Sequence, residues 1–226
     1  MKQHFHVEIQ ELKKTLVQMA GMVEDAIRKA IRSLSERDPE LAREVIETDR
    51  EIDRLEINLE DRCLLMLARY QPVAVDLRLI LVAVKMNNDL ERMGDHAVNI
   101  AEKASEILRI PALKPLVDIP YMAGIVQEMV RDSLDAFVQG DVEKAIGVCR
   151  RDDTVDALEQ QINRELLTYV MEDPQAISRA IDLTIVAKNL ERIADISTNI
   201  CEEVIFMVEA RTIKHHFGEG ERPDHP

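Results

Sequence analysis

Apolar side chains recur at steps of three and four along most of the chain, and charged side chains fill the positions between them. The pattern is clearest in two stretches, from about residue 41 to 66 and from about residue 82 to 100. The apolar positions are Leu41, Val45, Ile52, Leu55, Leu59, Cys63 and Met66 in the first stretch and Val82, Met86, Leu90, Met93, Ala97 and Ile100 in the second. This spacing places them on one face of a helix, so it predicts long amphipathic helices.

Few residues interrupt this pattern, and those that do indicate where helices begin and end. Asp38-Pro39 and Asp173-Pro174 each combine an N-cap side chain with a proline suited to the first helical position. Gly140-Asp141 pairs a C-terminal glycine with a new cap, and Gln71-Pro72 ends another periodic stretch. The predicted helices cover residues 5–36, 40–70, 74–109, 121–139, 142–172 and 175–215.

The segment from 111 to 120 is the one proline-rich connector, with Pro111, Pro115 and Pro120. It predicts a boundary between a first domain of residues 1–110 and a second domain of residues 121–217. The last residues, 218–226, lack apolar periodicity and are expected to form a loose tail.

Composition favours a wholly helical protein. Aromatic residues make up 3% of the 226 residues and there are only 7 glycines, whereas sheets are rich in aromatic residues and glycine turns. A net charge of -14 without a basic tract disfavours nucleic acid as a partner. No apolar run approaches the ~20 residues of a membrane-spanning helix. Three scattered cysteines suggest a reducing compartment, so we expect a cytoplasmic protein that does not insert into membranes.

The sequence also repeats itself. The string NDLERMGDHAVNIAE at 88–102 matches KNLERIADISTNICE at 188–202 in its Leu, Glu, Arg, Asp, Asn, Ile and Glu positions, a shift of 100. The string DREIDRLE at 49–56 aligns with DDTVDALE at 152–159, a shift of 103. We therefore predict an all-α fold of two tandem repeated three-helix bundles, with six long antiparallel helices in total.

Acidic side chains recur at equivalent positions of both repeats. Asp49/Asp53 precede the bend at Pro72 by about 20 residues, and Glu91/Asp95 follow it by about as many, so both pairs lie ~30 Å from the bend. Helices joined by a short turn run antiparallel, which brings the two pairs to the same height. Asp152/Asp156 and Glu191/Asp195 stand in the same relation to Pro174.

Four carboxylates on one patch repel one another unless a proton, an arginine such as Arg92 or Arg192, or a bound cation offsets their charge. Oxygen ligands suit hard cations such as Mg, Ca, Mn or ferric iron. We therefore predict one multi-carboxylate metal site in each repeat. The candidate ligands are Asp49, Asp53, Glu91, Asp95, Asp152, Asp156, Glu191 and Asp195. Glu47/Glu51 have the same spacing, so spacing alone also fits a solvated acidic surface.

Motifs for nucleotide binding, nucleophile elbows and zinc protease helices do not occur in the sequence. His96 of the first repeat is replaced by Ile196 in the second, so a mechanism shared by both repeats does not need this imidazole. We expect no enzymatic activity and no catalytic residues. Two alternatives are a metal-dependent hydrolase acting on phosphoesters and a purely structural helical assembly protein.

Two strings of the first repeat resemble the PhoU family: ARYQPVAVDLR at 68–78 and DLERMGDHAVNIA at 89–101. The resemblance runs from the first helix to about residue 210. It implies two three-helix bundles, usually assembled as a homodimer, whose E(D)xxxD motifs hold multinuclear metal clusters, often of iron. Those motifs fall on Asp49/Asp53 and Glu91/Asp95 in one repeat and on Asp152/Asp156 and Glu191/Asp195 in the other.

The resemblance also implies a regulatory function. It suggests a cytoplasmic adaptor between the ATPase subunit of an ABC phosphate transporter and a sensor histidine kinase. Such an adaptor is a negative regulator of phosphate uptake and of the phosphate-starvation response. The second repeat departs from the first at Ala176-Ile-Ser, where the first has Asp76-Leu-Arg. We therefore allow the second metal site to differ in its metal or its occupancy.

Overall fold

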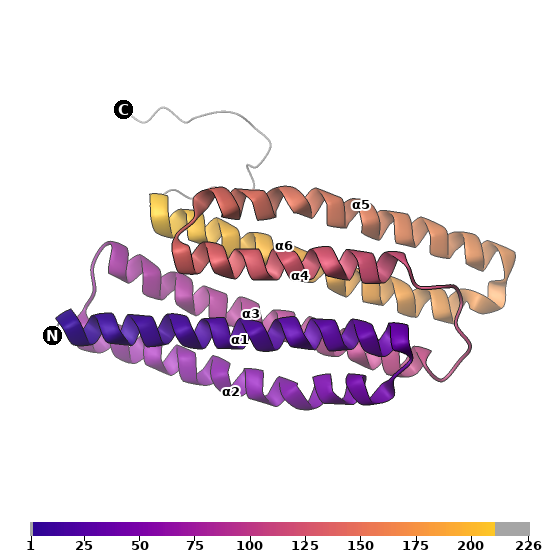
Figure 1. Ribbon diagram of the computed structural model, residues 1–226, viewed down its shortest axis with the longest axis horizontal. Helices are drawn as coiled ribbons and strands as arrows, with labels where there is room; N and C mark the ends of the chain where they lie inside the picture. The colour runs from indigo at the N-terminus through magenta and orange to yellow at the C-terminus, as the bar shows by residue number, and fades with distance from the viewer. Residues whose placement is uncertain (1, 211–226) are drawn as a thin grey trace.

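The computed structural model describes residues 2–210, and all regular structure within that range is helical. The elements are α1 (Lys2–Glu36), α2 (Pro39–Tyr70), α3 (Val75–Ile107), α4 (Asp118–Gln139), α5 (Val142–Glu172), the short 3-10 helix η1 (Pro174–Ala176) and α6 (Ile177–Glu209). Figure 1 shows the long axes roughly aligned, with α1 to α3 on one side and α4 to α6 on the other. The predicted end of the sixth helix at residue 215, the domain end at 217 and the tail lie outside the described residues.

Several helix ends form through the side chains that the sequence indicated. The Asp38 carboxylate accepts a hydrogen bond from the Glu40 N–H at 2.9 Å and caps α2. The Asp141 carboxylate accepts one from the Lys144 N–H at 3.0 Å and caps α5. Gly140 ends α4 with a φ of 68°, a left-handed conformation that glycine adopts without strain. These three predictions are confirmed.

Two helix starts differ from the predicted ones. Helix α4 begins at Asp118 rather than at 121, because Pro120 fits within a first helical turn, where its missing N–H costs no hydrogen bond. Pro174 opens the 3-10 helix η1 instead of α6. Asp173 accepts a hydrogen bond from the Gln175 N–H at 3.0 Å there, and α6 starts only at Ile177.

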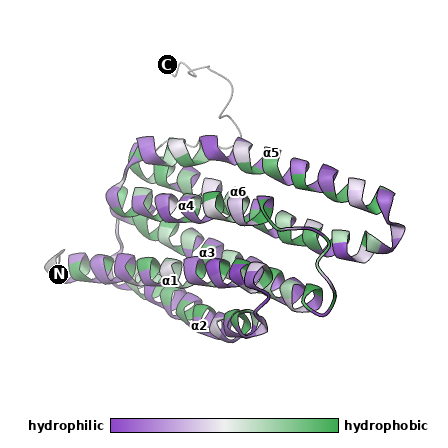
Figure 2. Ribbon diagram, turned by 45° about the vertical axis from the view of Figure 1, so that its right-hand side comes forward, coloured by the Kyte–Doolittle hydropathy of each residue, from purple (hydrophilic) through white to green (hydrophobic). Residues whose placement is uncertain are grey.

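The two bundles share one core because their third helices pack on each other. Helix α3 contacts α1, α2 and α6, while α6 contacts α4 and α5 as well as α3, and α1 lies along α4. Leu90 and Leu190, at equivalent positions of the two central helices, are both fully buried. Figure 2 shows hydrophobic and hydrophilic residues sharing every helix, as amphipathic packing requires. The predicted all-α fold of two antiparallel three-helix bundles is confirmed.

Helices α3 and α6 run antiparallel, which relates the repeats by an approximate two-fold rotation. His96 on α3 meets Asn189 on α6, and further along Lys103 meets Asp182. Ser33 on α1 and Ser133 on α4 also occupy equivalent positions: both are fully buried, and each donates a hydrogen bond of 2.8 Å to the carbonyl three residues earlier. The repetition seen in the sequence therefore extends to the core.

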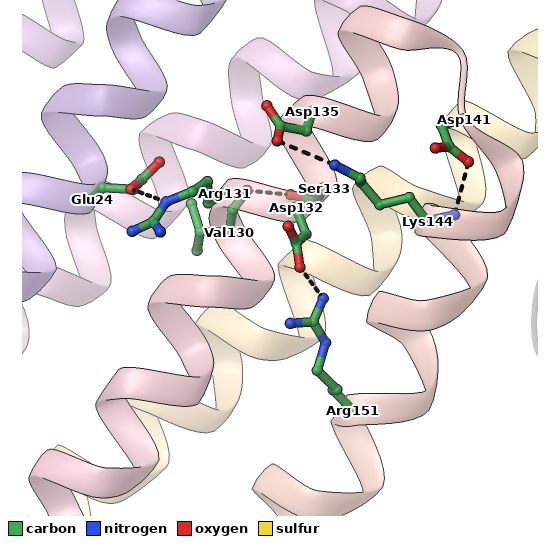
Figure 3. A network of polar contacts seen from close by, with 9 residues as sticks. All are labelled: Glu24, Val130, Arg131, Asp132, Ser133, Asp135, Asp141, Lys144 and Arg151. Carbon is green, nitrogen blue, oxygen red and sulfur yellow. Dashed lines mark hydrogen bonds and ion pairs between the residues drawn. The ribbon is translucent and has the colours of Figure 1, made fainter.

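Ion pairs hold α4 to the helices on either side of it. Arg131 of α4 pairs with Glu24 of α1 at 3.3 Å, and Asp132 of α4 pairs with Arg151 of α5 (Figure 3). The pair with Glu24 connects the second bundle to the first at the surface, above the shared core, and the pair with Arg151 holds α4 to α5 within the second bundle.

A buried lysine in the connector forms ion pairs with the second bundle. The side chain of Lys114 is only 3% exposed, and its ammonium pairs with Asp118 at 3.5 Å and with Glu165 of α5. A buried ammonium requires such partners because an unpaired one loses its hydration without compensation. The connector therefore lies against the second bundle.

Candidate functional site

The structure brings the four predicted carboxylates of the first repeat within reach of one another's charge. Asp49 and Asp53 extend from α2, and Glu91 and Asp95 from α3. Burial raises the pKa of Asp49, and the charges of Asp53 and Asp95 raise it further. Burial also raises the pKa of Glu91, followed by the charges of Asp95, Glu56, Asp53 and Asp49. The cluster therefore favours protons or a cation at its centre.

A glycine lets α2 and α3 approach closely beneath this first cluster. A Cβ at Gly94 would lie 3.3 Å from Cδ1 of the buried Ile52 and 3.6 Å from Oδ1 of Asp49. In the second repeat the equivalent positions hold Ala194 and Val155. Relative to the first repeat, the second has one methyl group fewer on α5, where Val155 replaces isoleucine, and one more on α6, where Ala194 replaces glycine. The total apolar volume of the pair is therefore conserved.

The four predicted carboxylates of the second repeat are also electrostatic neighbours. Asp152 and Asp156 extend from α5, and Glu191 and Asp195 from α6. Burial raises the pKa of Asp152 to about 7, and the charges of Asp195, Asp156, Glu191 and Asp153 contribute in that order. The pKa of Asp195 is raised first by burial and then by Glu191 and Asp156. The equal-height argument therefore holds in both repeats.

The second cluster contains buried carboxylate oxygens without hydrogen-bond partners, and one of its carboxylates is paired with a lysine. Oδ1 of Asp152 and Oε2 of Glu191 are buried and have no hydrogen-bond partner. The other oxygen of Glu191, Oε1, accepts from the Lys188 ammonium at 2.7 Å. Asn88 stands at the position of Lys188 in the first repeat, so only the second cluster has this built-in counter-charge.

Within residues 2–210, no three His, Cys, Asp or Glu side chains already converge closely enough to hold a metal ion. Within each cluster, the carboxylates are therefore close enough to shift one another's pKa but are not positioned as a complete set of metal ligands. Their assignment as metal ligands stays a prediction.

Two hollows are lined by residues of α3 and α6, the two helices through which the repeats pack on each other. The larger has a volume of about 540 Å³, and the smaller, of about 330 Å³, includes Lys85, Asp89 and Glu203. The larger is lined by Arg92 and His96 of α3 and by Arg192, Asp195, Asn199 and Glu202 of α6, among others. The sequence indicates the two arginines only as counter-charges for carboxylates. The two arginines occupy equivalent positions of the two repeats. Together with an antiparallel packing of α3 against α6, that equivalence would have predicted that both line one hollow.

His96 is partly buried at the junction of the two repeats. Asn189 donates through Nδ2 to the Ile185 carbonyl at 2.8 Å, which leaves its Oδ1 to accept from Nδ1 of His96 at 2.9 Å. Burial lowers the pKa of His96, and the charges of Arg192 and Arg92 also act in that direction. The imidazole of His96 therefore links α3 of the first repeat to α6 of the second through a hydrogen bond.

A family model, the PhoU domain, matches the chain twice, over residues 16–104 and 119–204. The chain belongs to the PhoU family. The resemblance seen in the sequence is therefore confirmed. Each match covers most of one of the two bundles, which agrees with a duplicated PhoU unit.

Relatives with PhoU names match the chain over nearly its whole length. A phosphate-specific transport system accessory protein PhoU homolog from Aquifex aeolicus is 49% identical and covers 92% of this chain and 94% of its own. The crystal structure of PhoU from Pseudomonas aeruginosa has a TM-score of 0.89 at 38% identity, over 92% of this chain and 100% of that one. The phosphate transport system regulatory protein PhoU from Streptococcus pneumoniae has a TM-score of 0.85 at 27% identity, over 93% and 99%.

The exchange of one methyl group beneath the clusters predicts energetic coupling between Gly94 and Ile52. Alone, Ile52→Val is expected to cost about 1 kcal/mol of unfolding free energy through the lost methyl group. In a Gly94→Ala background the same change relieves crowding, so its cost should fall by at least about 0.5 kcal/mol. A double-mutant cycle measured by urea unfolding checks this, and simple additivity of the two changes would contradict the packing described.

The raised pKa of Asp152 predicts that stability falls as pH rises. The folded chain holds this proton up to about pH 7, against an ordinary pKa of 3.8, so stability from the protonated carboxyl is lost as pH rises between these values. Protein freed of metal should unfold at a lower urea concentration near pH 7.5 than near pH 5. The loss should be on the order of 1–2 kcal/mol after allowing for the carboxyl's partial exposure.

Asp152→Asn should reduce that pH difference, because the amide does not titrate. The neighbouring Asp153→Asn, at an exposed position on the same helix, is the matched control and should leave most of the difference in place. An unchanged pH profile in Asp152→Asn would show that Asp152 does not hold its proton near neutrality.

Proposed function

We propose that this PhoU protein is a non-enzymatic regulatory adaptor of a phosphate transport system. The observation that carries the proposal is the match of both repeats to the PhoU domain, joined to near full-length relatives named as accessory proteins of the phosphate-specific transport system. The adaptor contacts the ATPase subunit of an ABC phosphate transporter and a sensor histidine kinase. It restrains phosphate uptake and the starvation response when phosphate is plentiful.

The proposed place of action is the cytoplasm, as a homodimer. None of the helices in the described range combines the length and the apolar character needed to cross a membrane. Both proposed partners consume ATP, which is a cytoplasmic compound, so an adaptor between them works on that side of the membrane.

We further propose that the carboxylate clusters bind hard cations, iron first by family resemblance, with Mg, Ca or Mn as alternatives. Buried oxygens of Asp152 and Glu191 have no hydrogen-bond partner, and a cation would supply one. In the first repeat Asp49, Asp53, Glu91 and Asp95 provide the same all-oxygen donor set. A bound cation would neutralise part of the acidic surface and link the two helices that carry each cluster.

The openness of both clusters supports a regulatory role over a hydrolytic one. Asp95, Asp156 and Asp195 are exposed residues on helix surfaces. Metal-assisted hydrolysis works best in a site that excludes bulk water and holds the substrate against the metal. An exposed cluster whose charge changes with cation occupancy is suited to controlling a contact surface.

Removing one carboxylate from each cluster should remove bound metal. Protein purified without chelator or polyhistidine tag should carry metal by mass spectrometry, and Glu91→Ala combined with Glu191→Ala should lose most of it. The pair Glu47→Ala and Glu51→Ala, acidic surface positions on α2 outside the clusters, is the control. Adding Mn²⁺ at about a hundred times its dissociation constant should stabilise wild type by about 2.7 kcal/mol. Equal metal content in both variants would rule out these ligands.

The adaptor proposal predicts co-purification with its partners. A pulldown at native expression levels should recover the transporter ATPase subunit or the kinase, with recovery that depends on external phosphate. Recovery of neither protein in both high and low phosphate overturns the proposal. Turnover of phosphoesters by the purified protein that disappears in Glu91→Ala would favour the hydrolase alternative instead.

A further inference from the structure

The larger hollow between α3 and α6 brings together the arginine that each repeat carries in its Leu-Glu-Arg string. Arg92 and Arg192 both line this hollow, one from each side of the two-fold relation. No described residue forms a hydrogen bond or ion pair with the side chain of Arg192. That of Arg92 has one such contact within the described range, at 3.4 Å to Asp89 of its own helix. Both guanidiniums therefore retain donors for a ligand.

Both arginines lie near a common point, because the charges of both act on the imidazole of His96 in the same hollow. Two guanidiniums that line one hollow can form a receptor for a small oxyanion, since each offers paired N–H donors to two oxygens. The amide of Asn199, on the same wall, can add a further donor.

The same hollow also contains acceptors, and these restrict the choice of anion. Nδ1 of His96 donates to Asn189, so Nε2 of the neutral ring is an acceptor. The carboxylate of Glu202 lines the hollow and accepts only, and Asp195 adds a second negative charge. A fully deprotonated anion meets repulsion here, whereas an anion that carries its own proton can donate to these groups.

We propose that this hollow binds hydrogen phosphate, or the phosphate group of a small phosphomonoester, at the junction of the two repeats. Arg92 and Arg192 donate to its unprotonated oxygens, and Glu202 and Nε2 of His96 accept from its P–OH group. Sulfate carries no proton at neutral pH and is rejected. The proposed function supplies only the reason to choose phosphate as the probe, and the arrangement of donors and acceptors stands apart from it.

Equilibrium dialysis with radiolabelled inorganic phosphate tests the proposal. The full chain is first treated with chelator, so that no cation in the carboxylate clusters can bind the anion. Wild type should show saturable binding to one site per chain. Arg92→Ala and Arg192→Ala should each weaken it at least about tenfold through the lost charged hydrogen bonds. Arg164→Ala, at an exposed position on α5 outside the hollow, should leave it unchanged.

Competition experiments distinguish the anions. Arsenate, which is protonated like phosphate, should displace the label, and sulfate should not, while Glu202→Gln should allow sulfate to compete. Phenyl phosphate that displaces the label more strongly than phosphate itself would identify a monoester as the preferred form of the ligand. Displacement by sulfate from wild type as effective as displacement by phosphate would overturn the proposal.

Two further results would also overturn it: no saturable binding up to about 10 mM phosphate, where even a weak site is filled, or equal binding by wild type and both arginine variants. Arg192→Lys keeps the positive charge but loses the paired N–H donors of the guanidinium, so it should bind phosphate with intermediate affinity. Thermal melting checks that each variant is folded. Phosphate binding without partner recovery would refute the adaptor alone. Partner recovery without phosphate binding would refute this site alone.

Discussion

The antiparallel packing of α3 against α6 is the contact on which the rest of the architecture depends. These two helices hold fully buried residues such as Leu90 and Leu190 along their shared core. Because equivalent helices meet in opposite directions, the helices and carboxylate pairs of one repeat recur in the other after an approximate two-fold rotation. The faces of α3 and α6 turned toward α2 and α5 carry the carboxylates. The crossing between them carries Arg92, His96 and Arg192, and Asp195 of the second cluster also lines the hollow there.

Placing carboxylates in rows on packed helices has an energetic cost that the apolar core offsets. Half-burial removes part of their hydration, and neighbouring charges add repulsion, which is why the pKa of Asp152 reaches about 7. The repeats meet this cost differently. Lys188 neutralises part of the second cluster through Glu191, whereas the first cluster has Asn88 at that position. The duplicated motif therefore does not produce two identical electrostatic environments.

Much of this fold could be predicted from the sequence because its determinants are local. The caps at Asp38 and Asp141 and the left-handed Gly140 act within about one helical turn, so their chemistry can be read directly from the sequence. The equal height of the carboxylate pairs follows from the fixed rise of a helix and a known bend. The start of α4 at Asp118 was missed because Pro120 is as compatible with a first turn as with a connector.

Features that depend on contacts between helices could not be predicted in the same way. Amphipathic periodicity shows that α3 and α6 are buried, but it does not say which helix covers which face. The hollow between them, and the pairing of Gly94 with Ile52, therefore appear only in three dimensions. The roles of the eight carboxylates as metal ligands and the domain boundaries at 110 and 121 stay predictions, since neither follows from helix packing.

The buried ammonium of Lys114 limits how the molecule can respond to its surroundings. Its ion pairs with Asp118 and Glu165 hold the end of the connector against the second bundle. The repeats could therefore part only by separating α3 from α6 and α1 from α4, which would expose their shared core. Large opening of one bundle from the other is therefore disfavoured. Any signal that crosses the protein must travel as small shifts of helices sliding within a continuous interior, which favours shear over hinge motion.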